Sequence, residues 1–130
     1  MSVGILLVTH EGIGTPLLAA AQRLLGSLPL RCNAFELPWA AEVEPSLPAA
    51  SAALRKVESE DGVLILSDLY GASPARLAAR LTQLGTPARR VSGLSLPMLL
   101  RALNYPEQPL DELARTAAGG GRNGIVQDEA

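Results

Sequence analysis

Apolar residues in this chain occur in short continuous runs, and each run is followed by a segment in which apolar residues recur at helical spacing. Residues 3–9 and 62–66 are almost entirely apolar rather than alternating, which is typical of strands buried on both faces of a parallel sheet. Residues 31–37 and 89–94 are interpreted as two further strands. The pattern therefore predicts strands that alternate with helices.

Two of the expected helices carry the same start signal. Thr15 and Ser73 are each followed by a proline, so a side chain that can cap a helix precedes a residue suited to the first helical turn. Further helices are predicted over three ranges: 46–57, 97–103 and 110–118.

The C-terminal segment breaks this pattern. Three consecutive glycines, residues 119–121, are interpreted as a flexible hinge. Residues 122–130 then form a C-terminal strand and tail, in which Ile125 and Val126 are an apolar pair outside any helical period. This last edge strand could extend the chain's own sheet or that of a neighbouring molecule.

The alternation predicts one α/β domain over residues 1–130, an open and mainly parallel sheet in the order 2-1-3-4 with helices on both faces. Strands one and three are then neighbours, and the chain leaves their carboxyl ends toward opposite faces, which opens a crevice where such sheets bind ligands. His10 follows the first strand and Asp68 the third. The only histidine is therefore expected beside an aspartate in that crevice.

His10 and Asp68 have the chemistry of a nucleophile and its orienting group. A carboxylate that accepts a hydrogen bond from one imidazole nitrogen fixes the tautomer and leaves the other nitrogen free to react. The helix starts at Thr15 and Ser73 offer unpaired N–H groups to a phosphate, less the one that each proline removes. Ser73 is expected to cap its helix and to donate its hydroxyl to a phosphate oxygen.

Each of these residues also has a purely structural interpretation. A lone histidine at a strand end is commonly a surface residue, Asp68 could be a turn residue, and Ser73 is first of all a helix cap. The expected pairing of His10 with Asp68 at the crevice favours the functional interpretation.

Composition limits the classes of binding partner and the cellular compartment that we expect. A net charge of −2 does not indicate the basic surface that nucleic-acid binding requires. Cys32 is the only cysteine, so no internal disulfide can form, which fits a reducing compartment. No apolar run reaches membrane-spanning length, and the N-terminal run lacks the features of a signal peptide. A cytoplasmic protein that does not insert into a membrane is therefore expected.

Missing motifs limit the chemistry further. The chain contains neither G-x-x-x-x-G-K-[ST] nor G-x-G-x-x-G, and its only lysine, Lys56, lies in a predicted helix. We therefore expect neither an ATP site nor a dinucleotide site. One histidine and one cysteine do not make a zinc site, so the expected chemistry requires no metal and no cofactor.

Three short motifs resemble one known family. They are Val8-Thr9-His10, the run Asp68-Leu69-Tyr70-Gly71-Ala72-Ser73-Pro74, and Gly93-Leu94-Ser95-Leu96-Pro97-Met98-Leu99. Their order and spacing are similar to those of the IIA components of the mannose type of the bacterial sugar phosphotransferase system, over roughly residues 3–126. The segment Gly121-Arg122-Asn123-Gly124-Ile125 is similar to the C-terminal segment of that family.

The resemblance implies a phosphoryl relay. His10 would accept phosphate on Nε2 from the histidine-containing phosphocarrier protein, with Asp68 orienting the ring, and would pass it to a IIB component or a regulatory target. The expected phosphate contacts are Ser73, Gly71, Ala72 and Thr9. Residues expected at the pocket rim are Trp39, Tyr70 and Pro97. The family is dimeric and exchanges its last strand, which implies a homodimer here.

Two positions depart from the family pattern. Family members often carry a second glycine where Ala72 stands and a small residue where Trp39 stands. Both positions lie close to the expected pocket, so they bear on the choice of acceptor.

Two other functions stay open at this point. A regulatory binding module would keep the fold and dock partners without turning over phosphate. A Ser-His-Asp hydrolase that uses Ser73 is less favoured, because G-x-S-x-G is absent and a serine that caps a helix makes a poor exposed nucleophile.

Overall fold

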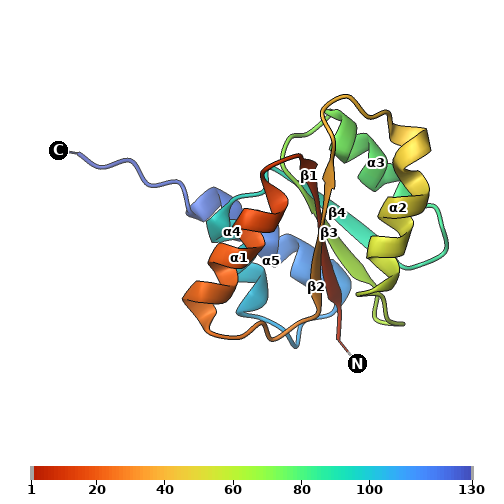
Figure 1. The fold of residues 1–130 in the computed structure, drawn as a ribbon. Coiled ribbons are helices and arrows are strands. Elements are labelled where there is room, and N and C mark those ends of the chain that lie inside the picture. Colours follow the sequence, from red (N-terminus) through yellow and green to blue (C-terminus); the bar gives the residue numbers. More distant parts are fainter. Residues whose placement is uncertain (1, 130) are drawn as a thin grey trace.

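The computed structural model describes residues 2–129. Strands and helices alternate along most of the chain (Figure 1), in the order β1 (Gly4–His10), α1 (Gly14–Leu25), β2 (Cys32–Leu37), α2 (Val43–Arg55), β3 (Val63–Ser67), α3 (Ser73–Leu81), β4 (Ala88–Ser92), α4 (Leu96–Leu103) and α5 (Leu110–Asn123). The predicted α/β organisation is confirmed.

The strands form a single parallel sheet in the order β2-β1-β3-β4, which confirms the predicted order. Its register sets His10 opposite Leu37 of β2, and Val8 opposite Ser67 of β3. The carboxyl ends of β1 and β3 therefore lie side by side. Asp68 directly follows β3, so it emerges next to the end of β1.

The core has two layers because consecutive side chains of a strand point to opposite faces of the sheet. Ile5 and Leu7 of β1 pack with α1, α4 and α5 on one face. Leu6 and Val8 pack with α2 and α3 on the other. Figure 1 shows these two helical layers on either side of the sheet. This burial on both faces explains why β1 reads as a continuous apolar run.

The start of α1 differs from the prediction, because the helix begins at Gly14 and Thr15 is not its N-cap. Side chains of β1 and β2 accept hydrogen bonds from the N–H groups at this end of the helix. The Thr9 hydroxyl accepts from Gly14 N at 2.9 Å. The Glu36 carboxylate accepts from Gly12 N at 2.9 Å and from Thr15 N at 2.8 Å. A strand residue thus supplies the cap that local sequence does not.

The predicted glycine hinge at residues 119–121 is wrong, since α5 continues through all three glycines to Asn123. The physical reason is close packing against α4. A Cβ at Gly120 would meet the side chain of Arg101, and a Cβ at Gly121 would lie 2.9 Å from Met98 Cε. Glycine is used here for the space it leaves, and the helical hydrogen bonds remove its freedom.

The end of the chain does not extend the chain's own sheet, which was one of the two predicted alternatives. Residues 125–129 form no strand within the described structure, and in Figure 1 they extend away from the sheet and helices. Ile125 and Val126 remain 83% and 76% exposed. The apolar pair therefore has no burial within a single chain.

Cys32 lies at the start of β2 with its thiol donating to the carbonyl oxygen of Leu30 at 3.4 Å. Burial raises the pKa of this thiol to about 12. At neutral pH the group is uncharged and poorly nucleophilic, as expected for a small side chain that serves packing.

Two glycine variants test the continuous α5 helix. Gly119→Ala should raise the free energy of unfolding by about 1 kcal/mol, because alanine is favoured over glycine inside a helix and the added Cβ has no atom within 4 Å. Gly120→Ala should instead lower it by roughly 1–3 kcal/mol, because its Cβ would overpack against Arg101. Chemical denaturation measures both changes. No gain from Gly119→Ala would favour the flexible hinge.

The cap supplied by Glu36 predicts a pH-dependent stability. The backbone hydrogen bonds from Gly12 and Thr15 hold the pKa of Glu36 below its ordinary value, so their contribution is present above that value and is lost as pH falls through the folded-state pKa. Glu36→Gln should cost about 1 kcal/mol at neutral pH, and wild type and variant should converge in acid. Urea unfolding across this pH range measures the difference.

The matched control is Glu60→Gln, since Glu60 is an exposed carboxylate between α2 and β3. It should leave stability unchanged at every pH. A penalty for Glu36→Gln that persisted in acid would show that the carboxylate charge is not what holds α1.

Candidate functional site

The centre of the site is a close pair between His10, the last residue of β1, and Asp68, the first residue after β3. Asp68 Oδ2 lies 2.7 Å from His10 Nδ1 and accepts the backbone N–H of His10 at 3.1 Å. An ionised carboxylate can only accept hydrogen bonds, so this geometry assigns the ring hydrogen to Nδ1. The Nε2 lone pair is then free to act as a nucleophile. The predicted proximity of the two residues is observed.

Burial strengthens this pair. The side chains of His10 and Asp68 are only 18% and 10% exposed. The second carboxylate oxygen, Asp68 Oδ1, is buried and has no hydrogen-bond partner among the described residues. Leaving a charged acceptor partly unpaired is costly. Its uncompensated negative charge would be offset when the neighbouring imidazole becomes cationic, which is the state that a nucleophilic histidine enters on reaction.

Trp39 covers one face of the imidazole. Its ring is stacked on His10 with centroids 4.6 Å apart and an interplanar angle of 18°. The register explains the contact, because His10 lies opposite Leu37 and Trp39 follows two residues later. The indole is 69% exposed, so it lies at the rim, where the sequence predicted it. The direct stack on His10 was not predicted.

The loop between β3 and α3 lies beside the pair. Gly71 has φ 82°, a left-handed conformation that suits glycine, and turns the chain toward α3. The N-cap of α3 is Ala72, and Ser73 makes no capping hydrogen bond, so the predicted cap at Ser73 is wrong. Its hydroxyl instead accepts from Arg76 Nη2 at 3.0 Å.

Arg76 is a candidate functional residue that the sequence analysis missed. Its guanidinium donates from Nη1 to the carbonyl oxygen of Gly71 at 2.9 Å and from Nη2 to Ser73. It therefore brings a positive charge to the loop that precedes α3. The available signal was its spacing, since a residue three positions after Ser73 lies on the same face of a helix.

The second predicted phosphate cradle, at the start of α1, is already occupied. Glu36 takes the N–H groups of Gly12 and Thr15. Thr9, predicted to contact phosphate, is fully buried. Its hydroxyl donates to the carbonyl oxygen of His10 at 2.8 Å and accepts from Gly14. The structure therefore places Thr9 in β1, where its hydroxyl links His10 to the start of α1 and has no free hydrogen for an anion.

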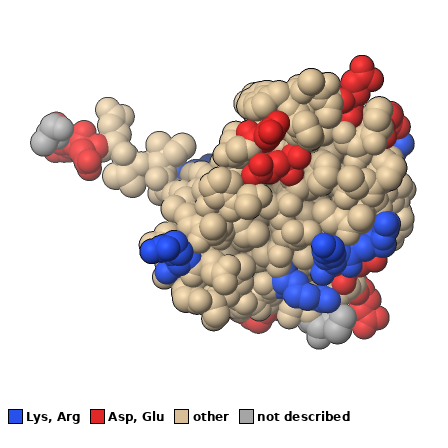
Figure 2. Space-filling view, in the orientation of Figure 1, with Lys and Arg blue, Asp and Glu red and all other residues tan. Residues whose placement is uncertain are grey.

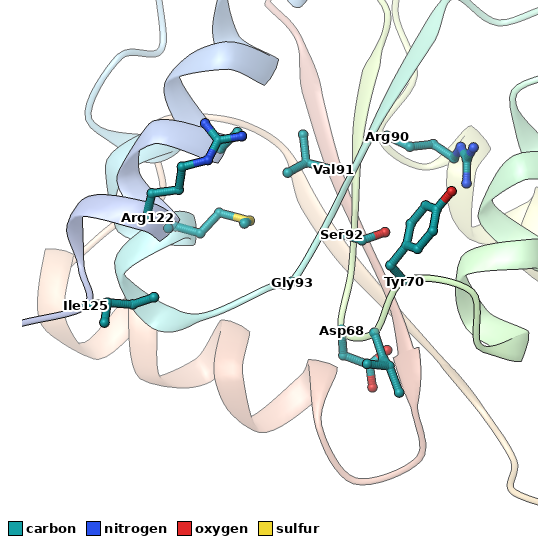
Figure 3. A pocket seen from close by; sticks show the side chains of 12 residues that line it. Asp68, Tyr70, Arg90, Val91, Ser92, Gly93, Arg122 and Ile125 are labelled. Atoms are coloured by element: carbon teal, nitrogen blue, oxygen red, sulfur yellow. The ribbon is translucent and has the colours of Figure 1, made fainter.

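Of the two remaining predicted rim residues, only Tyr70 lines a cavity, which lies on the β4 side of Asp68. Tyr70 is 81% exposed and lines it, whereas Pro97 packs against Gly124 at the end of α5. The cavity has a volume of about 710 Å³ and runs from the loop after β3, along β4, to α5. Figure 3 shows β4 on one side of it and Arg122 and Ile125 on the other.

Charged side chains and possible metal ligands outside this site give no further indication of function. On the face of the molecule in Figure 2, acidic and basic side chains lie in separate small groups. Among residues 2–129, no three histidine, cysteine, aspartate or glutamate side chains gather where they could hold a metal ion. Within the same part of the chain, no helix is long and apolar enough to cross a membrane.

Comparison of the sequence with known proteins shows relatives of one kind. The mannose-specific EIIAB component of the phosphotransferase system (PTS) of Escherichia coli K12 is 28% identical over 127 residues, which cover 96% of this chain and 39% of that protein. A putative phosphotransferase enzyme IIA component of the same strain, YadI, is 29% identical over 98 residues, covering 75% and 66%. The chain thus spans about two fifths of the length of the first relative.

Solved structures share the fold. The mannose/sorbose-specific IIA subunit from Enterococcus faecalis aligns with a TM-score of 0.87 at 23% identity, covering 100% of this chain and 97% of that one. The PTS component EIIA from Streptococcus agalactiae gives a TM-score of 0.81 at 21% identity, covering 96% of each. Residues 4–117 match the family model described as PTS system fructose IIA component. Because this match covers most of the sequence, the chain belongs to the mannose-type IIA family of the bacterial sugar phosphotransferase system.

Proposed function

We propose that this chain is a phosphohistidine carrier. His10 accepts a phosphoryl group from the histidine-containing phosphocarrier protein and passes it to a IIB component or a regulatory target. The observation that carries the proposal is the 2.7 Å contact between His10 Nδ1 and Asp68 Oδ2. In the neutral imidazole this contact places the hydrogen on Nδ1 and the lone pair on Nε2. Membership of the family and the absence of a long apolar helix among residues 2–129 support a role in the cytoplasm.

The transfer step follows from this geometry. The Nε2 lone pair forms a bond to phosphorus as the bond between phosphorus and the donor's imidazole nitrogen breaks, and the donor leaves as a neutral imidazole. Nδ1 keeps its hydrogen, so the His10 ring becomes cationic while it carries the phosphoryl group. Asp68 stabilises that charge through the same hydrogen bond that set the tautomer. Transfer to the acceptor reverses the step and restores the neutral ring.

The phosphoryl group would rest at the start of α3. The backbone N–H groups of Gly71 and Ser73 and the positive end of the α3 dipole favour an anion there. The Ala72 N–H already donates to the carbonyl oxygen of Leu69 at 3.3 Å. Because the Ser73 oxygen already accepts from Arg76, its own hydrogen is free to donate to a phosphate oxygen. Pro74 removes one backbone donor, and the Arg76 guanidinium adds positive charge in its place.

We also propose that the chain forms a homodimer through residues 124–129. β4 is an edge strand of the sheet, and the cavity beside it is lined by Val91, Met98 and Ile125 among others. Ile125 and Val126 have no burial in a single chain. Placing the tail of one subunit along β4 of another would cover both surfaces and pair the free strand edge.

The carrier function predicts that His10→Ala abolishes phosphoryl acceptance and leaves the protein folded. No second histidine can replace the nucleophile. Removing the ring from the buried Asp68 carboxylate should cost roughly 1–3 kcal/mol in stability, and the fold should survive because Asp68 still accepts the backbone N–H of residue 10. Incubation with phosphoenolpyruvate, enzyme I and the phosphocarrier protein, followed by mass spectrometry and thermal melts, measures both effects.

The same assay includes Asp68→Asn as the matched variant. An amide fits the same space but stabilises the cationic ring poorly, so the initial rate should fall by at least about tenfold. A wild type that gains no phosphoryl mass from a competent donor would favour a regulatory binding module. A His10→Ala variant that still gains it would place the acceptor elsewhere.

The proposed dimer predicts that wild type sediments at twice the chain mass and that deletion of residues 124–130 yields a folded monomer. The cut leaves α5 intact to Asn123, so the core packing is preserved. The double variant Ile125→Asp, Val126→Asp should dissociate in the same way, because charge replaces the exposed apolar pair. A dimer that survives both changes would have its interface elsewhere.

A further inference from the structure

We propose that Trp39 is a positioning residue for phosphoryl transfer. Its indole fixes the plane of the His10 ring and stabilises the positive charge that the ring carries with the phosphoryl group. This inference rests on the proposed role of His10. Asp68 alone does not fix the plane of the ring, because its hydrogen bond at Nδ1 restrains only one edge.

The geometry gives the first part of the argument. Asp68 holds Nδ1 at 2.7 Å, and the stack on Trp39 at 18° restrains the tilt of the ring. Together the two contacts fix the direction of the Nε2 lone pair before a donor arrives. Reaction rates depend strongly on such alignment of the attacking atom.

Electrostatics gives the second part. The π face of tryptophan attracts a cation within about 6 Å of the ring centroid, and the His10 and Trp39 centroids are 4.6 Å apart. In the proposed transfer step the His10 ring gains positive charge. The stack therefore stabilises the product and the transition state more than the neutral starting ring, which is the condition for faster transfer.

The loop that carries Trp39 is held at its backbone. Trp39 N donates to Glu11 Oε1 at 3.4 Å, and Ala41 N donates to the carbonyl oxygen of Pro38 at 3.0 Å. Since the indole is 69% exposed, its position is not fixed by core packing. Its ring stacks on the imidazole of His10, which separates it from an ordinary buried aromatic.

The competing explanation is that Trp39 is a contact for the donor protein. A small donor separates the two, because phosphoramidate has no docking surface. In that reaction Nε2 bonds to phosphorus, the nitrogen–phosphorus bond of phosphoramidate breaks, and ammonia leaves. The His10 ring again keeps its Nδ1 hydrogen and becomes cationic, so the positioning effect is retained.

The experiment compares wild type, Trp39→Ala and Trp39→Phe with phosphoramidate and with the phosphorylated phosphocarrier protein. Trp39→Ala should slow phosphorylation by phosphoramidate by about threefold to tenfold, and Trp39→Phe should recover part of the loss. With the protein donor, Trp39→Ala should lower kcat and leave KM unchanged. The control is Tyr105→Ala, an exposed aromatic in the loop after α4, which should match wild type.

A second readout does not depend on phosphoryl transfer. Trp39 is the only tryptophan, so its fluorescence reports the stack directly, and His10→Ala should change its emission. Unchanged emission would overturn the proposed contact.

The phosphorylation rates test the positioning role of Trp39 and the relay function of His10 separately. Equal rates for wild type and Trp39→Ala with phosphoramidate, or a loss confined to KM with the protein donor, would overturn the positioning role. Phosphorylation of wild type by phosphoramidate but not by the protein donor would remove the relay function and leave the Trp39 comparison valid. No phosphorylation by either donor would overturn both.

Discussion

The hydrogen bond between His10 and Asp68 is the interaction on which the site depends, and the sheet makes it possible. His10 ends one strand that is buried on both faces and Asp68 directly follows another, and the two strands are paired neighbours in the sheet. The pair is therefore positioned by the most rigid part of the fold. Because one carboxylate oxygen holds both the backbone and the ring of His10, the orientation of the imidazole is coupled directly to the packing of β1 on β3.

The two helix N-termini near this pair have different electrostatic roles. Glu36 supplies an internal anion to the start of α1, which satisfies its N–H groups and offsets the positive end of its dipole. At the start of α3 no carboxylate accepts from the backbone N–H groups among the described hydrogen bonds, and Arg76 lies beside Ser73. In the proposed carrier function, a phosphoryl group would therefore be favoured on the α3 side of the imidazole and opposed by Glu36 on the α1 side.

Much of this arrangement could be predicted from the sequence. The continuous apolar runs indicated buried parallel strands, and their order predicted His10 and Asp68 at one crevice. The errors arose where only local propensity was used. At the hinge of residues 119–121 and the cap at Thr15, residues distant along the chain overrode that propensity: Arg101 and Met98 beside the glycines, and Glu36 beside Thr15. At Ser73 the cause is local, since Ala72 is the N-cap of α3 and the Ser73 hydroxyl accepts from Arg76.

The sequence by itself determined the fold class, the sheet order and the proximity of His10 to Asp68, because these follow from the period of apolar residues and from connectivity. Only the tertiary structure decided which of two helix starts is open to an anion, and that Trp39 stacks on His10. These features depend on contacts between segments that lie more than twenty residues apart in sequence. Periodicity carries no information about such contacts, since it describes which face a side chain occupies and not what it meets there.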